Sequence, residues 1–136
     1  MAIVGIGIDL VDIDRAERLL ARHGERALRR LLSPAERAYV EGMVTPARHF
    51  AVRLAAKEAV YKALQTLPGA TAVGWKDIEV LRATSGRPGI QLHGTAARLV
   101  AGLGAHRIHV TLTHTERTAG AVAVVERTGM DGNRRE

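Results

Sequence analysis

The chain opens with a stretch, residues 3–10, in which side chains alternate as they do in a β-strand. One face carries only aliphatic residues: Val4, Ile6, Ile8 and Leu10. The opposite face begins with Ile3, continues with Gly5 and Gly7, and ends with Asp9. A glycine in a strand lets another backbone or a ligand approach closely. The pattern therefore predicts a strand with one crowded face that ends in a carboxylate.

Start and stop signals predict a first helix soon after this strand. Asp14 with Glu17 three residues later has the pattern of a capping box, in which each residue bonds the other's backbone N–H. We expect this helix to run to about His23 and to stop at Gly24. A short helical segment follows over residues 25–32.

Two further helices are predicted before residue 68. Ser33-Pro34-Ala35-Glu36 combines an N-cap, a proline in the first turn and a glutamate at the third position, and this helix should end near Gly42. Thr45-Pro46 opens a longer helix that should end within residues 64–67, because Pro68-Gly69 breaks it.

The second half of the chain is mostly strand-like. Residues 75–82 and 90–93 predict a hairpin around a turn at 85–89, and Thr95 caps a helix that fades at 102–104. Residues 108–113 alternate as a strand does. The small apolar run 119–125 fits a strand buried on both faces. Helices early and strands late indicate the α+β class.

Composition limits the kind of protein. A chain of 136 residues suits one domain, here residues 1–127, followed by a tail at 128–136 that we expect to be disordered. Aromatic residues are only 3%, so the core must be small and aliphatic, a kind that oligomerisation can complete. The absence of cysteine excludes disulfides and thiolate metal sites. No leader or membrane-spanning run is present, so we expect a soluble cytoplasmic protein.

The charge balance favours anionic partners. The formal net charge is +6, which attracts nucleic acid, phosphorylated small molecules or an acidic protein. No aromatics are interleaved with the basic residues, and zinc-finger spacing is absent. A nucleic-acid module is therefore the weakest of these options.

The long predicted helix carries charges in an apolar setting. Arg53, Lys57, Glu58 and Lys62 stand among alanine, valine and leucine. Glu58 and Lys62 are four residues apart and share one face, whereas Arg53 is about half a turn out of line with Glu58. Charges are costly to bury without partners, so they form either a solvated stripe or a wall facing a charged ligand. The apolar neighbours favour the second interpretation.

Asp9 and Glu58 suggest a metal site. Two carboxylates, one from a strand end and one from a helix, suit Mg²⁺, which takes few protein carboxylates together with waters and phosphate oxygens. Lys62 would then meet a phosphate as a point charge. The alternatives are that Asp9 caps a turn and that Glu58 and Lys62 form a surface pair worth about 0.2–0.5 kcal/mol.

Two other groups have both a structural and a functional interpretation. His114 and Thr115 belong to a polar run after a strand, which either binds an anion or simply forms a turn. Arg15, Arg18 and Arg22 recur at helical spacing, so they form either a solvated face or a dock for an acidic partner.

Four segments, taken together, resemble one family. They are Gly5-Ile6-Gly7-Ile8-Asp9-Leu10-Val11, Arg53-Leu54-Ala55-Ala56-Lys57-Glu58-Ala59 with Lys62-Ala63, Trp75-Lys76-Asp77-Ile78-Glu79-Val80 with Gly86-Arg87-Pro88, and Leu112-Thr113-His114-Thr115. In this order and spacing the chain resembles the holo-[acyl-carrier-protein] synthase group of 4′-phosphopantetheinyl transferases. The resemblance covers nearly the whole chain except the tail.

The resemblance implies an antiparallel sheet with a long central helix packed on it. It also implies transfer of the 4′-phosphopantetheine arm of coenzyme A to a serine of apo acyl carrier protein, with release of adenosine 3′,5′-bisphosphate. Mg²⁺ and a homotrimer with active sites between subunits are further implications. Whether the carrier serves fatty-acid or polyketide synthesis stays open.

The resemblance also assigns roles to residues. Asp9 and Glu58 fall on metal-binding positions, and Lys62 on the lysine that meets the phosphates. Arg53 and His114 fall on positions associated with coenzyme A binding, and Thr115, next to His114, is assigned to the same binding site. Arg15, with Arg18 and Arg22 on the same helix face, falls near the docking surface for the carrier. The general base is either Glu58 or a metal-bound water.

One departure separates this chain from the family pattern. Relatives place a glycine pair soon after the Lys-Ala of the long helix, whereas here the run is Leu64-Gln65-Thr66-Leu67-Pro68-Gly69. This departure keeps a second hypothesis open, that of a non-catalytic basic scaffold that binds carrier protein or nucleotide.

Overall fold

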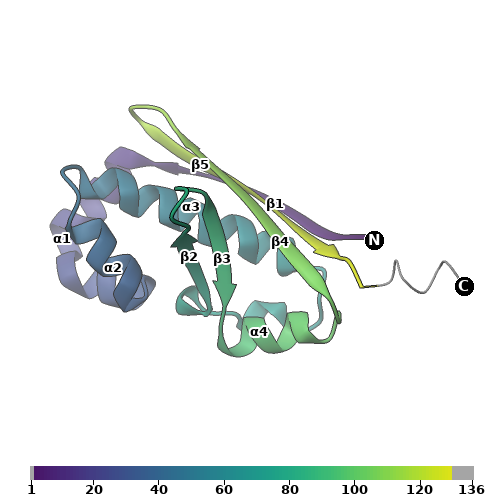
Figure 1. Cartoon of the computed structure of the whole chain (residues 1–136). Helices are drawn as coiled ribbons and strands as arrows, with labels where there is room; N and C mark the ends of the chain where they lie inside the picture. The colour runs from purple at the N-terminus through teal and green to yellow at the C-terminus, as the bar shows by residue number, and fades with distance from the viewer. Residues whose placement is uncertain (1, 130–136) are drawn as a thin grey trace, which may run out of the picture.

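A long helix, α3 (Pro46–Leu64), lies along one face of a three-stranded antiparallel sheet, as Figure 1 shows. The strands are β1 (Ala2–Asp12), β4 (His106–His114) and β5 (Thr118–Arg127), in the order β1-β5-β4. The computed structural model describes residues 2–129. The predicted α+β class, with a long central helix on an antiparallel sheet, is confirmed.

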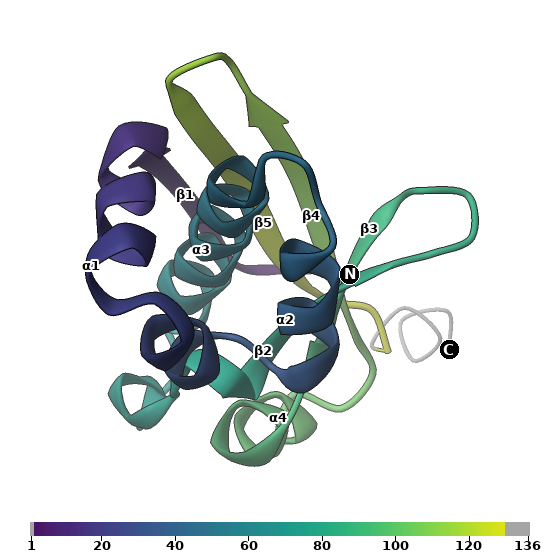
Figure 2. The ribbon, with the colours of Figure 1, turned by 90° about the vertical axis from the view of Figure 1, so that its left-hand side faces the viewer.

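The remaining elements surround α3. Helices α1 (Ile13–Leu31) and α2 (Pro34–Glu41) pack against it, and Figure 2 shows them on its two sides. Two short 3₁₀ turns, η1 (Ala70–Ala72) and η2 (Trp75–Asp77), lead into a second, two-stranded sheet. Its strands are β2 (Ile78–Arg82) and β3 (Pro88–Leu92), and α4 (Gly94–Ala101) leads back to β4.

Two glycines bring β1 into backbone contact with α3. A methyl group added at Gly5 would lie 1.8 Å from the carbonyl oxygen of Ala63, and one added at Gly7 would lie 1.8 Å from that of Ala59. Only a residue without Cβ fits at this separation. The crowded strand face predicted from the sequence is therefore present. Asp9 is the next residue on this face, so the strand also brings Asp9 close to α3.

The aliphatic face of β1 points away from α3. Ile6, Ile8 and Leu10 are 65%, 61% and 69% exposed. A break in register between Ile3 and Gly5 puts one extra residue in the strand, so Ile3 is exposed and Val4 packs against the core. The predicted sides of Ile3 and Val4 were therefore wrong, because alternation cannot register a bulge.

Strand β5 is central but not fully covered. Its residues Ala119, Ala121, Ala123 and Val125 are buried under α3, whereas Val122 and Val124, on the face shared with Ile8, are only half-buried. The prediction that this strand is buried on both faces was thus correct only for the face of β5 that packs against α3.

Several predicted boundaries need correction. The first helix is capped by Asp12, whose side chain accepts a hydrogen bond from the Asp14 N–H at 3.0 Å, so Asp14 lies inside the helix. Its kink at Gly24, where φ is 48°, is where the sequence predicts the stop. Residues 75–77 form a 3₁₀ turn instead of strand. The N-cap of helix α4 is His93, two residues before the predicted Thr95.

The helix starts marked by local chemistry are as predicted. Ser33 and Glu36 form the reciprocal capping box of α2, and α3 begins at Pro46 and ends at Leu64. In the expected tail, the N–H groups of Thr128 and Gly129 both bond to Ala105, and 130–136 lie outside the described residues. None of the helices described is both long and apolar enough to cross a membrane.

Candidate functional site

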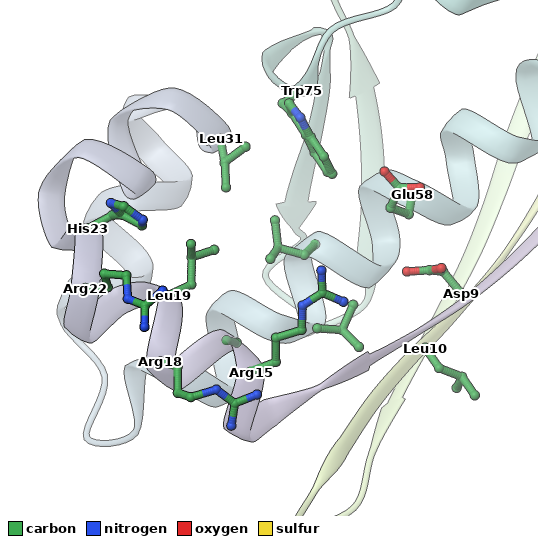
Figure 3. Close-up of a pocket in the computed structure, with 13 residues that line it drawn as sticks. Asp9, Leu10, Arg15, Arg18, Leu19, Arg22, His23, Leu31, Glu58 and Trp75 are labelled. Atoms are coloured by element: carbon green, nitrogen blue, oxygen red, sulfur yellow. The ribbon is translucent and has the colours of Figure 1, made fainter.

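A cavity of about 700 Å³ lies where the end of β1, helix α1 and the middle of α3 meet. Figure 3 shows Asp9 and Glu58 near one another on one side and the arginines of α1 on the other. The lining residues are Asp9, Leu10, Val11, Arg15, Ala16, Arg18, Leu19, Arg22, His23, Leu31, Leu54, Glu58 and Trp75. The structure thus unites the two predicted acidic residues with the three predicted docking arginines.

Lys62 contacts Asp9 rather than its helical neighbour Glu58. Its Nζ donates to Asp9 Oδ1 at 3.0 Å and to the Ile8 carbonyl oxygen at 2.9 Å. Half of the Lys62 side chain stays exposed. A surface Glu58–Lys62 pair, the structural interpretation considered from spacing, is therefore not what forms. The lysine spans from α3 to the strand end and keeps N–H capacity for an anion.

Glu58 is a carboxylate in unfavourable surroundings. Partial burial and the negative charge of Asp9 raise its pKa, and Lys62 opposes them with a smaller effect. A cation placed between these carboxylates would stabilise the charged form of Glu58 and so oppose both effects. The two side chains offer only hard oxygen ligands, which suits Mg²⁺.

The acidic pair is small for a metal site made of protein alone. Within residues 2–129 no group of three or more His, Cys, Asp or Glu side chains is arranged to hold a metal ion. Zinc sites need such a group, whereas Mg²⁺ is held by one or two carboxylates, waters and substrate phosphates. Asp9 and Glu58 therefore fit Mg²⁺ better than a transition metal.

Arg53 and His114 belong to a different cationic cluster. Arg53 is buried, and its guanidinium lies 4.2 Å from the ring centroid of Tyr39. Burial lowers the pKa of Arg53. Burial also lowers the pKa of His49, and so do the positive charges of four neighbours: Arg53, Arg48, Arg82 and His114. Arg53 Nε is buried without a hydrogen-bond partner. None of these residues lines the cavity at Asp9.

Thr115 organises a turn. Its Oγ1 accepts from the N–H groups of Thr118 and Arg117 at 3.1 Å and 3.3 Å, and it closes the β4–β5 hairpin. His114 Nδ1 is 3.4 Å from the Thr115 carbonyl oxygen, and its ring is exposed. The structure therefore separates the coenzyme A residues predicted by resemblance into two places within one chain, with Lys62 in the first and Arg53, His114 and Thr115 in the second.

A buried ion pair beside the cavity was not predicted. Lys57 Nζ lies 2.8 Å from Glu36 Oε1, and both side chains are almost fully buried. Burial lowers the pKa of Lys57, and the adjacent Glu36 carboxylate partly offsets this. The sequence does indicate that Lys57 needs a partner, because this charged residue stands among alanines. It does not indicate that the partner is Glu36, because the position of Glu36 in the sequence is that of a helix-capping residue.

Trp75 is the other missed residue. Its side chain lines the main cavity and also a second cavity of about 290 Å³, with Lys57, Glu58, Tyr61, Val73, Gly74 and Ile78. Glu58 and Trp75 are the two residues common to both linings. The sequence predicts a strand at Trp75, whereas the structure has a 3₁₀ turn there, and this turn places the side chain in the wall of both cavities.

The segment after α3 takes a compact path without the family's glycine pair. Thr66 Oγ1 donates to the Val4 carbonyl oxygen at 3.0 Å, and Gln65 Nε2 donates to that of Ala70 at 3.3 Å. Gly69 supplies the positive φ, 85°, that the turn requires. In this chain the glycine of the turn therefore comes later in the sequence, and one side-chain bond, from Thr66, ties the segment to β1.

Comparison with known proteins gives consistent results. The model of the 4′-phosphopantetheinyl transferase superfamily matches residues 5–121. The chain is 42% identical over 125 residues to the holo-[acyl-carrier-protein] synthase of Koribacter versatilis, covering 91% of this chain and 98% of that one.

Solved structures agree. The acyl carrier protein synthase of Mycobacterium tuberculosis superposes with a TM-score of 0.72 at 37% identity, covering 93% of this chain and all of that one. A holo-(acyl-carrier-protein) synthase of Bacillus anthracis, solved in complex with CoA (3′,5′-ADP), gives a TM-score of 0.74 at 31% identity, covering 93% and 98%.

Proposed function

The chain belongs to the 4′-phosphopantetheinyl transferase superfamily, and on that premise we propose that it is a holo-[acyl-carrier-protein] synthase. It transfers the 4′-phosphopantetheine group from coenzyme A to a serine of apo acyl carrier protein. The observation that carries the proposal is the single cavity that joins Asp9, Glu58 and the arginines of α1. An acidic site for chemistry and a basic wall for an acidic partner are what this reaction needs.

The reaction is a phosphoryl-type transfer. The serine hydroxyl oxygen forms a bond to the β-phosphorus of coenzyme A, the bond to the leaving phosphate breaks, and adenosine 3′,5′-bisphosphate departs. The serine proton passes to Glu58 or to solvent. Negative charge grows on the phosphate oxygens, so positioning and electrostatic stabilisation carry most of the catalysis.

Asp9 and Glu58 would hold Mg²⁺. When bound, the ion supplies positive charge to the diphosphate. The raised pKa of Glu58 supports this role, because partial burial and the nearby Asp9 carboxylate both disfavour its charged form, which a bound cation would stabilise. Lys62, which is hydrogen-bonded to Asp9 and has half its side chain exposed, would bind the departing phosphate.

The second cationic cluster would bind the other anionic groups of coenzyme A. The buried, unpartnered Nε of Arg53 and the neighbouring imidazole of His114 support a role in anion binding. Thr115 would contribute by holding the turn after His114. This cluster does not line the cavity at Asp9. One coenzyme A molecule could contact both sites if it were bound between two subunits, with each subunit contributing one of the sites.

A homotrimer would meet that need. Support comes from the outer face of β1, where the side chains of Ile6, Ile8 and Leu10 are mostly exposed although they are aliphatic. A face of this kind is normally covered by another chain. The proposal also includes a cytoplasmic location, which stays a prediction.

Mass spectrometry of an apo acyl carrier protein tests the proposal. Incubation with this protein, coenzyme A and Mg²⁺ should add one phosphopantetheine to the carrier, and chelation of the metal should prevent it. Asp9→Ala and Glu58→Ala should abolish the transfer while the circular dichroism spectrum stays unchanged. Binding of the carrier without any mass gain, under every metal tried, would favour the non-catalytic scaffold instead.

A further inference from the structure

The ammonium of Lys57 has no donor left for a ligand. A lysine carries three N–H donors. Those of Lys57 have three acceptors: Glu36 Oε1 at 2.8 Å, the Trp75 carbonyl oxygen at 2.9 Å, and the Ile78 carbonyl oxygen. The residue next to Glu58 in the sequence therefore works inside the protein and not on the substrate.

Glu36 completes the same arrangement from the other side. Its Oε1 accepts from the Ser33 N–H and its Oε2 from the Val80 N–H, both at 2.8 Å. Strand β2 pairs only with β3 in the part of the chain that is described, so its second edge has no strand opposite. The Lys57–Glu36 pair takes the place of that missing strand, because it bonds Ile78 O and Val80 N on this edge.

The bonds to Trp75 and Ile78 bracket the short turn η2. This turn has only three residues, and its first residue is Trp75. Lys57 bonds the carbonyl oxygen of Trp75, the first residue of the turn, and that of Ile78, which directly follows the turn. It therefore fixes the turn against α3 next to Glu58. Figure 3 shows the Trp75 ring above the cavity on the side where Glu58 lies.

We propose that Lys57 is a positioning residue: with Glu36 it holds the Trp75–Asp77 turn against α3, so that the Trp75 indole forms the wall shared by the two cavities that meet at Glu58. The catalytic consequence rests on the proposed function. With the wall in place, a group bound at Glu58 is confined between the indole and β1. Without it, the reacting groups lose orientation, and a displacement of about 1 Å costs about a hundredfold in rate.

The test uses Trp75 as its own reporter, because it is the only tryptophan in the chain. In Lys57→Met, which keeps the length of the side chain and removes all donors, the apo protein should show lower fluorescence anisotropy and stronger acrylamide quenching than wild type. The kcat for transfer should fall by about tenfold or more, with a smaller change in KM for coenzyme A.

Val40→Ala is the matched control. Val40 is fully buried in the cluster around Phe50 and lies on α2, as Glu36 does, but its side chain is apolar and makes no hydrogen bond. It should lower the thermal midpoint while leaving Trp75 fluorescence and kcat as in wild type. If Lys57→Met does not fold, Lys57→Met with Glu36→Leu removes both charges together, which buried pairs often tolerate.

A double-mutant cycle separates positioning from general destabilisation. If Lys57 acts through the indole, Lys57→Met should have no further effect on kcat in a Trp75→Ala background. Additive losses in kcat, or wild-type quenching in a folded Lys57 variant, would overturn the inference. If wild type itself transfers nothing, the proposed function fails, and the fluorescence comparison still decides whether Lys57 places Trp75.

Discussion

Lys57 and Glu58 are neighbours in sequence but have opposite surroundings. One step along a helix turns the side chain by about 100°. For Lys57 this direction leads into the core, where Glu36 and two carbonyl groups bind it. For Glu58 it leads to the cavity, where burial and Asp9 raise the carboxyl pKa. At the scale of residues, then, one charge is satisfied internally and the other faces the cavity.

Glu58→Gln should abolish transfer and raise stability at neutral pH. The folded state raises the pKa of Glu58, so it binds this proton more tightly than the unfolded state does. Wild-type stability therefore falls as pH rises from the ordinary glutamate pKa through the raised one. Glutamine escapes this loss, and because Glu58 is partly exposed we expect a gain of at most about 1 kcal/mol.

Denaturant titrations of metal-free protein at pH 7 and at pH 4 measure this difference. The advantage of Glu58→Gln should be present at pH 7 and should shrink at pH 4. The exposed Glu17→Gln provides the control and should show little change at either pH. A variant less stable than wild type at pH 7 would contradict the assigned cause of the pKa shift.

At the scale of elements, the contact between β1 and α3 and the basic helix α1 build the site. Gly5 and Gly7 let the strand lie on the helix backbone, and Asp9 is carried in by the same strand face. Helix α1 follows immediately after its Asp12 cap and so places its first turns beside Asp9. The cavity is thus a consequence of how closely β1 can approach α3.

Gly7→Ala should be destabilising by about 1–3 kcal/mol, because the added methyl group overlaps the Ala59 carbonyl oxygen and forces the two elements apart. Activity should also fall, since Asp9 moves with the strand. Gly89→Ala is a suitable control, because nothing lies within 4 Å of the added group. Chemical denaturation of both variants provides the comparison, and equal stabilities would show that the contact is not tight.

Reversal of Arg15, Arg18 and Arg22 to glutamate should raise KM for the carrier protein more than KM for coenzyme A. These side chains line the cavity, and the partner that we propose is acidic. The effect should weaken at high salt, because exposed charges are screened.

Helix α1 also offers a matched triple for this test. The control set consists of three other arginines of α1 that follow the break at Gly24 and do not line the cavity: Arg26, Arg29 and Arg30. Because each set contains three arginines, reversal to glutamate changes the net charge by the same amount. Steady-state kinetics of both triple variants should show a large KM effect for the first set only. Equal effects would attribute docking to overall charge instead of to this surface.

At the scale of the whole molecule, the single chain leaves one sheet face uncovered. Ile6, Ile8 and Leu10 project from β1, and the half-buried Val122 and Val124 of β5 lie beside them. The two clusters that we assign to coenzyme A also lie apart within one chain. Both features are accounted for if the functional unit contains more than one copy.

Ile6→Lys with Ile8→Lys should convert an oligomer into monomers, because charges would have to be buried at the interface. Light scattering coupled to gel filtration measures the mass. Leu81→Lys, which changes an exposed apolar residue on β2, should leave the oligomer intact. A monomeric wild type, or an oligomer that persists in the double variant, would remove the sheet face from the proposed interface.

The local elements of this protein were predictable because their signals are short-range. The capping box at Ser33 and Glu36, the break at Gly24 and the two ends of α3 each depend on contacts within about one turn, and all are present as expected. Two N-caps were misplaced by two residues, at Asp12 and His93, because several neighbouring residues could serve as the cap. The bulge after Ile3 was missed because it depends on a strand partner far away in the sequence.

The candidate site divides along the same line. Sequence alone singled out Asp9, Glu58 and Lys62 as chemistry-bearing residues, because charges in an apolar context and a glycine-lined strand are visible without coordinates. Only the tertiary structure decided that Lys62 pairs with Asp9, that Glu36 neutralises Lys57, and that Arg53 stands in a separate cluster. The residue that pairs with a given charge is set by how distant elements pack together: Lys62 and Asp9 are 53 residues apart in the sequence. A pattern of neighbouring residues carries no information about a partner so far away.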